Sequence, residues 1–295
     1  MRIDAHHHLW RPQPGPPVTS GPTRRPHGWL DGPGLTAIRR DFTLDDLAAA
    51  AASADVGRTV LVQVLPDVEE TAEFLALAGT DPHGLVAGVV GWVDLTDERV
   101  GDTLAALRAG PGGELLVGVR HLVQGEADDA WLTRPDVRRG LRAVASAGLV
   151  YDLLTVPRQL PAAIDTVRAL PELAFVLDHL SKPPIASGAR EPWASLVRGL
   201  AAEPNVVCKL SGMVTEADHR SWTVADLRPY TDVVLDAFGP RRLMFGSDWP
   251  VCLLAAPYDR VVAAAEELTA GLTADDRAHV FGGTATRTYR LGDTR

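Results

Sequence analysis

Eight short apolar runs, each followed by a stretch of helical character, account for most of this 295-residue chain. The runs lie at 2–10, 59–65, 85–93, 116–122, 149–154, 174–179, 206–210 and 243–248. Helices are expected at 43–54, where Thr43 and Asp46 form a capping box, and at 69–78, 98–109, 135–147, 160–170, 193–202, 224–238, 261–268 and 274–289. Strict alternation of this kind predicts a parallel sheet whose strands are joined by crossover helices.

The number of pairs separates the two common parallel-sheet architectures. Eight pairs close into a (β/α)8 TIM barrel, and 295 residues with 46% hydrophobic content suit one α/β domain spanning residues 1–295. An open doubly wound sheet is the alternative, but no glycine-rich phosphate-binding turn follows the first strand. Residues 11–41 form a long loop rich in proline and glycine, and loops of this length are often lids or binding loops.

Charge and composition exclude several classes of protein. A formal net charge of -9 argues against a surface for nucleic acid or anionic membranes. No apolar run reaches membrane-spanning length, and the N-terminus lacks the order of a signal peptide. The only two cysteines, Cys208 and Cys252, cannot form a disulfide framework. These features predict a cytoplasmic protein that acts on a small molecule, and they leave a homodimer open.

Polar side chains gather where the predicted strands end. The strand ends of a barrel meet at one rim, where active sites are built. The polar residues at these ends are His6, His8, Gln63, Asp94, Arg120, His121, His179, Lys182 and Asp248. So many polar groups at matching positions predict an enzyme.

The first strand carries the strongest single signal. Because alternate side chains of a strand share a face, Asp4, His6 and His8 are expected on one side, opposite Ile3, Ala5 and His7. Two imidazoles at this spacing converge on a small volume, where they can bind a metal ion or polarise a carbonyl group.

Six segments together resemble the amidohydrolase superfamily. They are Asp4-Ala5-His6-His7-His8-Leu9-Trp10, Gly91-Trp92-Val93-Asp94-Leu95, Gly118-Val119-Arg120-His121, Asp178-His179-Leu180-Ser181-Lys182-Pro183, Lys209-Leu210-Ser211-Gly212 and Phe245-Gly246-Ser247-Asp248-Trp249-Pro250. Within the superfamily they are similar to the lactonase branch, which includes enzymes of the fuconolactonase, rhamnonolactonase and pyrone-dicarboxylate lactonase types. The resemblance extends over nearly the whole chain and implies a barrel in which water attacks an ester carbonyl.

The resemblance also implies roles for matching residues. Asp248 would be the general base that deprotonates water. His6, His8 and His179 would surround the carbonyl oxygen as metal ligands or as hydrogen-bond donors. The fifth strand offers no further histidine and the fourth no bridging carboxylate or lysine, so a two-metal site is not expected. One divalent ion, with zinc as the expected metal, is predicted at His6, His8 and Asp248, with His179 as an optional ligand, and metal-independent catalysis stays open.

Other rim residues are expected to bind the substrate. They are Gln63, Trp92, Arg120, His121, Tyr151, Lys182 and Trp249. Arg120 and Lys182 are the only basic groups clearly at the rim, so a neutral sugar-acid lactone is favoured over a dicarboxylate lactone. Two other classes remain as alternatives. One is a decarboxylase of an aromatic or unsaturated carboxylate, and the other is a non-catalytic sugar-binding barrel.

Overall fold

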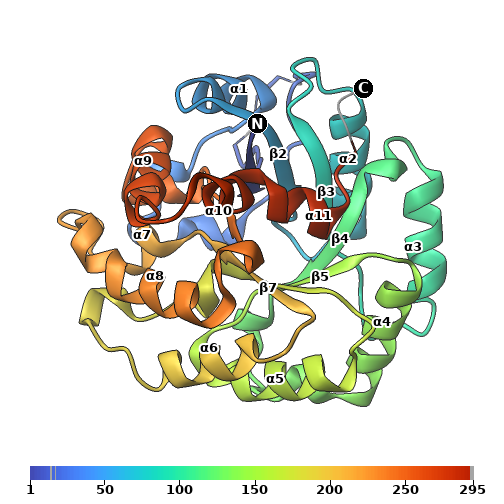
Figure 1. Cartoon of the computed structure of the whole chain (residues 1–295). Coiled ribbons are helices and arrows are strands. Elements are labelled where there is room, and N and C mark those ends of the chain that lie inside the picture. The colour runs from blue at the N-terminus through green and yellow to red at the C-terminus, as the bar shows by residue number, and fades with distance from the viewer. Residues whose placement is uncertain (14, 17, 293–295) are drawn as a thin grey trace.

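Eight parallel strands pair in sequence order, from β1 with β2 to β7 with β8, in the computed structural model of the protein (Figure 1). The structure describes residues 1–13, 15–16 and 18–292. The strands are β1 Arg2–His7, β2 Val56–Val62, β3 Val86–Gly91, β4 Leu116–His121, β5 Val150–Leu153, β6 Phe175–Leu177, β7 Val206–Leu210 and β8 Leu243–Phe245. The segment after β8 closes the sheet onto β1, because the Asp248 N–H donates to the His6 carbonyl (2.9 Å) and the His8 N–H to the Trp249 carbonyl (2.7 Å). The predicted (β/α)8 barrel is confirmed.

The helices follow the predicted order with small shifts at their ends. They are α1 Leu44–Ala52, α2 Val68–Gly79, α3 Val100–Ala109, α4 Pro135–Ser146, α5 Leu160–Ala169, α6 Trp193–Ala201, α7 Met213–Glu216, α8 Val224–Phe238, α9 Tyr258–Leu268, α10 Ala274–Ala278 and α11 Thr284–Tyr289. The capping box of Thr43 and Asp46 at the start of α1 is confirmed. The short α7 was not predicted.

The prediction of one continuous helix at 274–289 is wrong. A π-turn at His279–Gly283 separates α10 from α11 where the chain crosses the start of β1. A Cβ atom on Gly282 would lie 2.8 Å from the Met1 carbonyl oxygen, so this crossing needs a glycine. In Figure 1, α11 lies in front of the strands and covers the amino-terminal end of the barrel.

The inside of the barrel has an apolar level and a polar level. The apolar level lies at the end covered by α11, and its members are Ile3, Ala5, Val60, Val62, Ala87, Val90, Val150, Val176, Met244, Ala285, Tyr289 and Leu291. Towards the other end the inward positions become charged: Asp152 comes two residues after Val150, Asp178 two residues after Val176, and Lys209 is the last but one residue of β7. A polar core therefore directly underlies the carboxyl-terminal rim.

The expectation that Asp4 shares one face of β1 with His6 and His8 is wrong. Ile3 and Ala5 pack inside the barrel, whereas Asp4 accepts hydrogen bonds from Ser247 and from Tyr258 of α9. The cause is a register shift against β2 between Asp4 and His7. An irregularity of this kind changes which face the later side chains occupy, so His6 turns inward although Asp4 does not.

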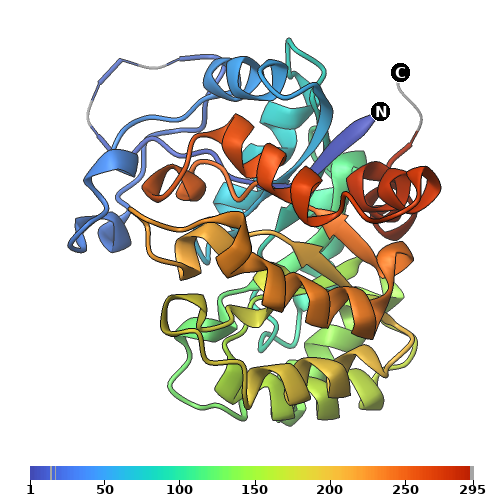
Figure 2. The same cartoon turned by 60° about the vertical axis from the view of Figure 1, so that its left-hand side comes forward.

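The long β1–α1 loop lies at the side of the molecule away from α11, as the dark blue segment on the left of Figure 2 shows. It contains two short 3₁₀ turns, Gly28–Asp31 and Thr36–Ile38. Asp41 holds the loop through Arg11 (3.3 Å) and Arg24 (2.8 Å). Trp10 Nε1 donates to the Ile38 carbonyl (3.1 Å), which fastens the loop to the end of the first strand.

Two further expectations concern the whole chain. Within residues 1–13, 15–16 and 18–292, no helix has both the length and the apolar character needed to cross a membrane. Cys208 and Cys252 are both free and buried.

Candidate active site

A cavity of about 280 Å³ opens at the carboxyl-terminal rim of the barrel. It brings together Arg120 of β4 and residues from the segments that follow β1, β2, β4, β5, β6 and β8, including the long β1–α1 loop. The lining residues are His8, Trp10, Trp29, Val64, Arg120, Leu122, Gln124, Leu154, His179, Lys182, Asp248 and Val251. Five of the residues selected from the sequence therefore share one cavity: His8, Arg120, His179, Lys182 and Asp248.

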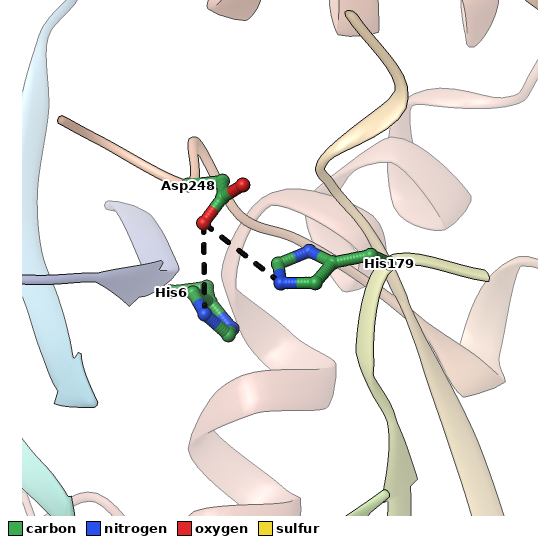
Figure 3. Close-up of side chains that lie close together, drawn as sticks. All are labelled: His6, His179 and Asp248. Atoms are coloured by element: carbon green, nitrogen blue, oxygen red, sulfur yellow. Dashed lines mark ion pairs between the residues drawn. The ribbon is translucent and has the colours of Figure 1, made fainter. Parts of the chain in front are cut away.

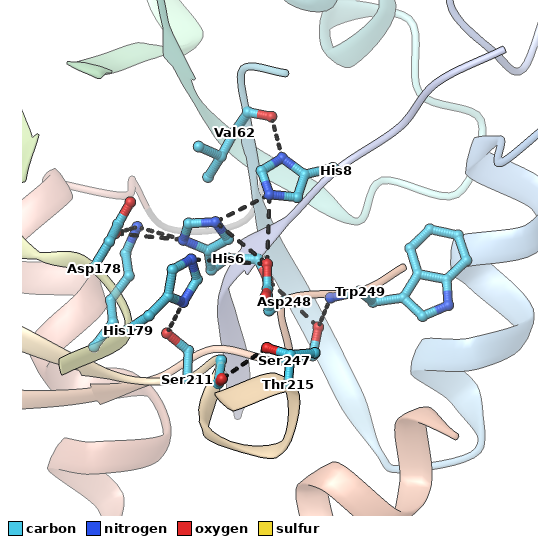
Figure 4. Close-up of polar contacts among 12 residues, drawn as sticks. His6, His8, Val62, Asp178, His179, Ser211, Thr215, Ser247, Asp248 and Trp249 are labelled. Carbon is cyan, nitrogen blue, oxygen red and sulfur yellow. Dashed lines mark hydrogen bonds and ion pairs between the residues drawn. The ribbon is translucent and has the colours of Figure 1, made fainter. Parts of the chain in front are cut away.

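Asp248 lies on a tight turn after β8 rather than on the strand itself. Its backbone adopts a φ of 58°, and neighbouring Ser247 donates its hydroxyl to Asp4 (2.5 Å), which fixes the turn against β1. The Asp248 Oδ1 atom faces three imidazole nitrogens, the Nε2 atoms of His6 (3.8 Å) and His179 (3.8 Å) (Figure 3) and of His8 (3.5 Å) (Figure 4).

The surroundings of Asp248 keep it ionised. Burial alone would raise the pKa of this carboxyl group, but His179 and His8 more than offset that effect, and the pKa falls below its ordinary value. A buried, ionised carboxylate at the floor of a cavity can accept a proton from water.

His179 is held on a left-handed turn after β6. His179, Leu180, Ser181 and Lys182 have φ values of 50°, 55°, 58° and 51°, a conformation that costs about 1–2 kcal/mol for each residue with a side chain. Buried contacts offset this cost: Trp193 Nε1 donates to the Leu180 carbonyl (2.7 Å), and the Ser181 hydroxyl bonds Thr155 (2.8 Å). Strained backbone of this type clusters at functional sites.

The histidine rings have fixed orientations because each Nδ1 atom has a partner. His179 Nδ1 lies 2.8 Å from the Ser211 hydroxyl, and His8 Nδ1 lies 2.8 Å from the Val62 carbonyl oxygen (Figure 4). Burial lowers the pKa of His179 to about 4, and burial with the nearby Lys209 holds the pKa of His6 well below its usual range. Both rings are therefore neutral at pH 7 and can donate from one nitrogen only.

Arg120 lies on the inner side of the histidines. Its guanidinium group donates to Asp178 (3.1 Å) and to both the backbone and the side-chain oxygen of Gln63 (2.7 and 2.9 Å), and it lies 3.2 Å from His6 Nε2. Gln63 is fully buried. The structure thus joins Gln63 to the site through Arg120, whose donors are largely occupied by protein groups.

Below the histidines lies a buried ionic network that the sequence analysis did not select. Lys209 Nζ contacts Asp152 (2.6 Å), Asp178 (3.0 Å) and His6 Nδ1 (3.1 Å), and all four side chains are fully buried. Tyr289 of α11 donates its hydroxyl to Asp152. The available signal was a charged residue inside an otherwise apolar strand, as Lys209 is in Val206–Leu210.

Five of the expected substrate-binding residues lie outside the cavity lining: Gln63, which reaches the site through Arg120, and Tyr151, Trp92, His121 and Trp249. Tyr151 is fully buried and packs edge-on against Phe175, on the helix side of the barrel wall. Trp92 donates from Nε1 to His121 (3.0 Å), whose ring stacks on Trp131. Trp249 is buried.

The tryptophans that do line the cavity are Trp10 and Trp29. Their rings meet edge to face, with centroids 5.3 Å apart. Trp29 reaches the site from the long loop, and its exposed fraction of 40% leaves part of the ring accessible.

One divalent ion fits the donor set. Ligand atoms of His6, His179 and Asp248 lie within 4.8 Å of one another, and nitrogen with carboxylate oxygen is a donor set that zinc accepts. His8 Nε2 borders the same space, 3.5 Å from Asp248 Oδ1. The permanently charged Arg120 guanidinium lies on the inner side, 3.2 Å from His6 Nε2, which disfavours a second ion beside His6.

Comparison with known proteins agrees with this geometry. The family model described as amidohydrolase matches residues 3–291. L-fucono-1,5-lactonase of Burkholderia ambifaria is 40% identical over 295 residues, covering 99% of this chain and 96% of that protein. L-fucono-1,5-lactonase of Burkholderia multivorans is 39% identical over 302 residues, with the same coverage of 99% and 96%. A crystal structure of a Burkholderia multivorans amidohydrolase with bound zinc superposes with a TM-score of 0.88 at 39% identity, covering 99% of this chain and 100% of that one. The chain therefore belongs to the amidohydrolase family.

Proposed function

We propose that this chain hydrolyses a sugar-acid lactone to the open hydroxy acid. The observation that carries the proposal is the ionised Asp248 carboxylate, which lines the rim cavity and faces three imidazole Nε2 atoms at 3.5–3.8 Å. Lactone hydrolysis needs a base for water and a group that stabilises negative charge on the carbonyl oxygen, and this arrangement supplies both. Relatives at 39–40% identity named L-fucono-1,5-lactonase support the same reaction.

The proposed reaction proceeds in two steps. Asp248 takes a proton from water while the water oxygen bonds to the lactone carbonyl carbon, and the carbonyl π electrons move onto its oxygen. Imidazole N–H groups stabilise that oxyanion. When the carbonyl re-forms, the bond to the ring oxygen breaks, and this oxygen takes the proton back from Asp248. The product is a carboxylic acid with a free hydroxyl group.

We propose zinc as the ion that the site accepts. Its ligands would be Asp248, His179 and either His6 or His8. Its donor set fits, and a related structure contains zinc. A bound divalent ion would polarise the carbonyl group and lower the pKa of water. The proton transfer through Asp248 is the same with or without the ion.

The cavity walls favour a neutral sugar lactone with an apolar substituent. One wall is aliphatic, formed by Val64, Leu122 and Leu154, and Trp29 offers an accessible ring face. Little positive charge is free to bind carboxylates, because Arg120 is engaged with Asp178 and Gln63. Lys182 is paired with Glu216 (2.8 Å). We therefore propose a six-carbon aldonolactone, with a 6-deoxy lactone such as L-fucono-1,5-lactone preferred.

A pH-indicator assay tests the proposal. The panel contains L-fucono-1,5-lactone, its 6-hydroxy counterpart L-galactono-1,5-lactone, a pyrone dicarboxylate, and an aromatic carboxylate monitored for CO2. We expect the fastest turnover with the 6-deoxy lactone and slower turnover with the 6-hydroxy lactone. Preference for the dicarboxylate contradicts the neutral substrate, and CO2 release without lactone hydrolysis contradicts the hydrolase.

A further inference from the structure

A continuous line of polar contacts runs from the polar core of the barrel through His6 of β1 and through His8, which directly follows β1. Lys209 Nζ lies 3.1 Å from His6 Nδ1, His6 Nε2 lies 3.1 Å from His8 Nε2, and His8 Nδ1 lies 2.8 Å from the Val62 carbonyl oxygen. All of these groups are buried. The two ends of the line have fixed hydrogen-bond character, because an ammonium group can only donate and a carbonyl oxygen can only accept.

These fixed ends determine where the hydrogens lie. Since Lys209 donates, His6 Nδ1 is the nitrogen without hydrogen, and neutral His6 carries its hydrogen on Nε2. Since the Val62 carbonyl accepts, His8 Nδ1 carries a hydrogen. Two nitrogens 3.1 Å apart share a single hydrogen, so His8 Nε2 presents a lone pair to the Nε2–H of His6.

Two neighbours favour the opposite arrangement: Asp178, whose Oδ1 lies 3.4 Å from His6 Nδ1, and Arg120. Its Nη1 lies 3.2 Å from His6 Nε2 and could donate to a lone pair there. The same nitrogen already donates to Asp178 (3.1 Å), and Nη2 donates to Gln63. Lys209 has no comparable freedom, because its ammonium donates to Asp152 (2.6 Å) and to His6 Nδ1 (3.1 Å) and forms an ion pair with Asp178 (3.0 Å).

We infer that Lys209 is a positioning residue that gives His6 and His8 opposite tautomers and therefore different tasks. His6 presents an N–H and donates to the oxygen on which negative charge develops. His8 presents a lone pair, and of the two histidines it is the one that ligates a divalent ion. The assignment of the first task rests on the proposed hydrolysis, whereas the tautomers themselves do not.

Nitrogen-15 NMR of the unmodified protein, freed of metal and labelled at histidine, tests the tautomers without any assay of activity. Substitutions His6→Gln and His8→Gln assign the two rings. We expect His6 to be protonated at Nε2 and His8 at Nδ1. Protonation of His6 at Nδ1 overturns the inference, even if the protein proves to be an active lactonase. A protein without lactonase activity but with these tautomers overturns only the proposed function.

The Lys209→Met variant tests the consequence. Without the ammonium, the hydrogen of His6 moves to Nδ1, where Asp178 Oδ1 lies 3.4 Å away, and Nε2 gains a lone pair. We expect kcat to fall about 10²–10³-fold with little change in KM, because one donor to the oxyanion is lost. The affinity for zinc, titrated alone by calorimetry, should rise on the order of tenfold, because the His6 Nε2 lone pair becomes available as a ligand in addition to that of His8.

Opposite changes in hydrolysis and zinc affinity distinguish positioning from a merely structural role. The Lys182→Met variant is the control for charge in the titration, since Lys182 is the only other lysine and does not contact His6. Loss of both hydrolysis and zinc binding in a folded Lys209→Met protein contradicts the inference, and so does a gain in zinc affinity no larger than that of Lys182→Met. If Lys209→Met does not fold, the nitrogen-15 NMR measurement of the His6 and His8 tautomers in the unmodified protein decides whether the inference holds.

Discussion

The Tyr289 hydroxyl group lies 2.8 and 2.9 Å from the two carboxylate oxygens of Asp152. Tyr289 belongs to the helix that covers the amino-terminal end of the barrel, and Asp152 lies inside β5. Asp152 in turn contacts Lys209, which reaches His6. The covering helix is therefore connected to the catalytic rim through only three contacts between side chains.

The same contacts also pair the buried charges of the polar core. Asp152 and Asp178 are matched by Lys209 and Arg120, so the polar core contains equal numbers of carboxylates and cations. A buried ion is tolerated when it is paired and hydrogen-bonded, and removing one partner is costly. Asp248 is outside this balance, which leaves its negative charge available for a proton or a metal ion.

Asp248→Asn should fold normally and lose hydrolysis. Asparagine adopts positive φ readily, so it suits the backbone at φ 58°, while the amide has no useful basicity. We expect kcat/KM to fall about 10²–10⁴-fold in a steady-state lactonase assay, the usual size of a general-base contribution.

The matched control is Asp55→Asn. Asp55 is exposed, lies just before β2 and has a φ of 54°, so it repeats the chemical change on the same kind of backbone away from the site. Its activity should stay within twofold of the unmodified protein, by the small effect expected of surface substitutions. Near-full activity of Asp248→Asn would assign the base to another group.

Gly212→Ala should displace His179. Gly212 has a φ of 65°, and a Cβ atom there would lie 2.7 Å from His179 Cγ and Nδ1. The ring also loses its place beside the Ser211 hydroxyl. We expect a loss of kcat of about tenfold or more, of the size seen when the support of a catalytic group is disturbed. Steady-state kinetics and a crystal structure of the variant check this.

Gly188→Ala is the control that separates the clash with His179 from the cost of placing alanine at a positive φ. Gly188 has nearly the same conformation, with φ 72° and ψ 1°, and no atom lies within 4 Å of its would-be Cβ atom. Both variants should lose about 1 kcal/mol of stability, since φ is positive at each site. Equal kinetic effects of the two substitutions would show that contact with His179 is not the cause.

The sequence carried enough information for the barrel and for the centre of the site. Strand–helix alternation specified the strand order, and residues at strand ends meet at one rim whatever their exact geometry. Asp248, His8, His179, Arg120 and Lys182 were therefore found without a structure. Whether a residue lies at the end of a strand depends on its neighbours in the sequence, so the sequence pattern can predict it.

The parts that were missed depend on three-dimensional detail. The register shift in β1 separates Asp4 from His6, and no local pattern reports such a shift. Tyr151 and Asp152 are neighbours in sequence but face opposite sides of the barrel wall. Trp29 enters the cavity from a long loop, whose path depends on contacts such as Arg24 with Asp41.

The protein should bind no more than one equivalent of zinc. Asp248, His179 and one of the two histidines His6 and His8 offer ligand atoms around a single position, and the Arg120 guanidinium lies 3.2 Å from His6 Nε2, where it would repel a second ion. Elemental analysis after dialysis against zinc-free buffer measures the ratio. His179→Gln should lower the retained zinc, whereas substitution of exposed His219 should not. Two tightly bound equivalents would contradict the single site.

Glu70→Gln should change how stability depends on pH. Glu70 of α2 is buried, and its Oε2 accepts the backbone N–H groups of Val64 (2.8 Å) and Leu65 (2.9 Å) beside the cavity. Burial raises its pKa from 4.5 to about 7, which these two hydrogen bonds only partly oppose. Between these two values the folded protein retains a proton that the unfolded chain has lost. Stability therefore falls as pH rises through this range, and the loss is complete above about pH 7.

The size of this effect follows from the shift. A difference of about 2.5 pKa units corresponds to roughly 3 kcal/mol, which unmodified protein should lose between pH 4.5 and pH 8 through Glu70 alone. Glutamine keeps an oxygen for the two N–H groups but does not titrate, so Glu70→Gln should gain stability relative to the unmodified protein as pH rises. Urea midpoints at pH 5 and pH 8 measure the difference. Glu69→Gln, on the adjacent and highly exposed residue of the same helix, is the control and should follow the unmodified protein. Parallel pH dependence of Glu70→Gln and the unmodified protein would mean that Glu70 is already ionised in the folded state at pH 5.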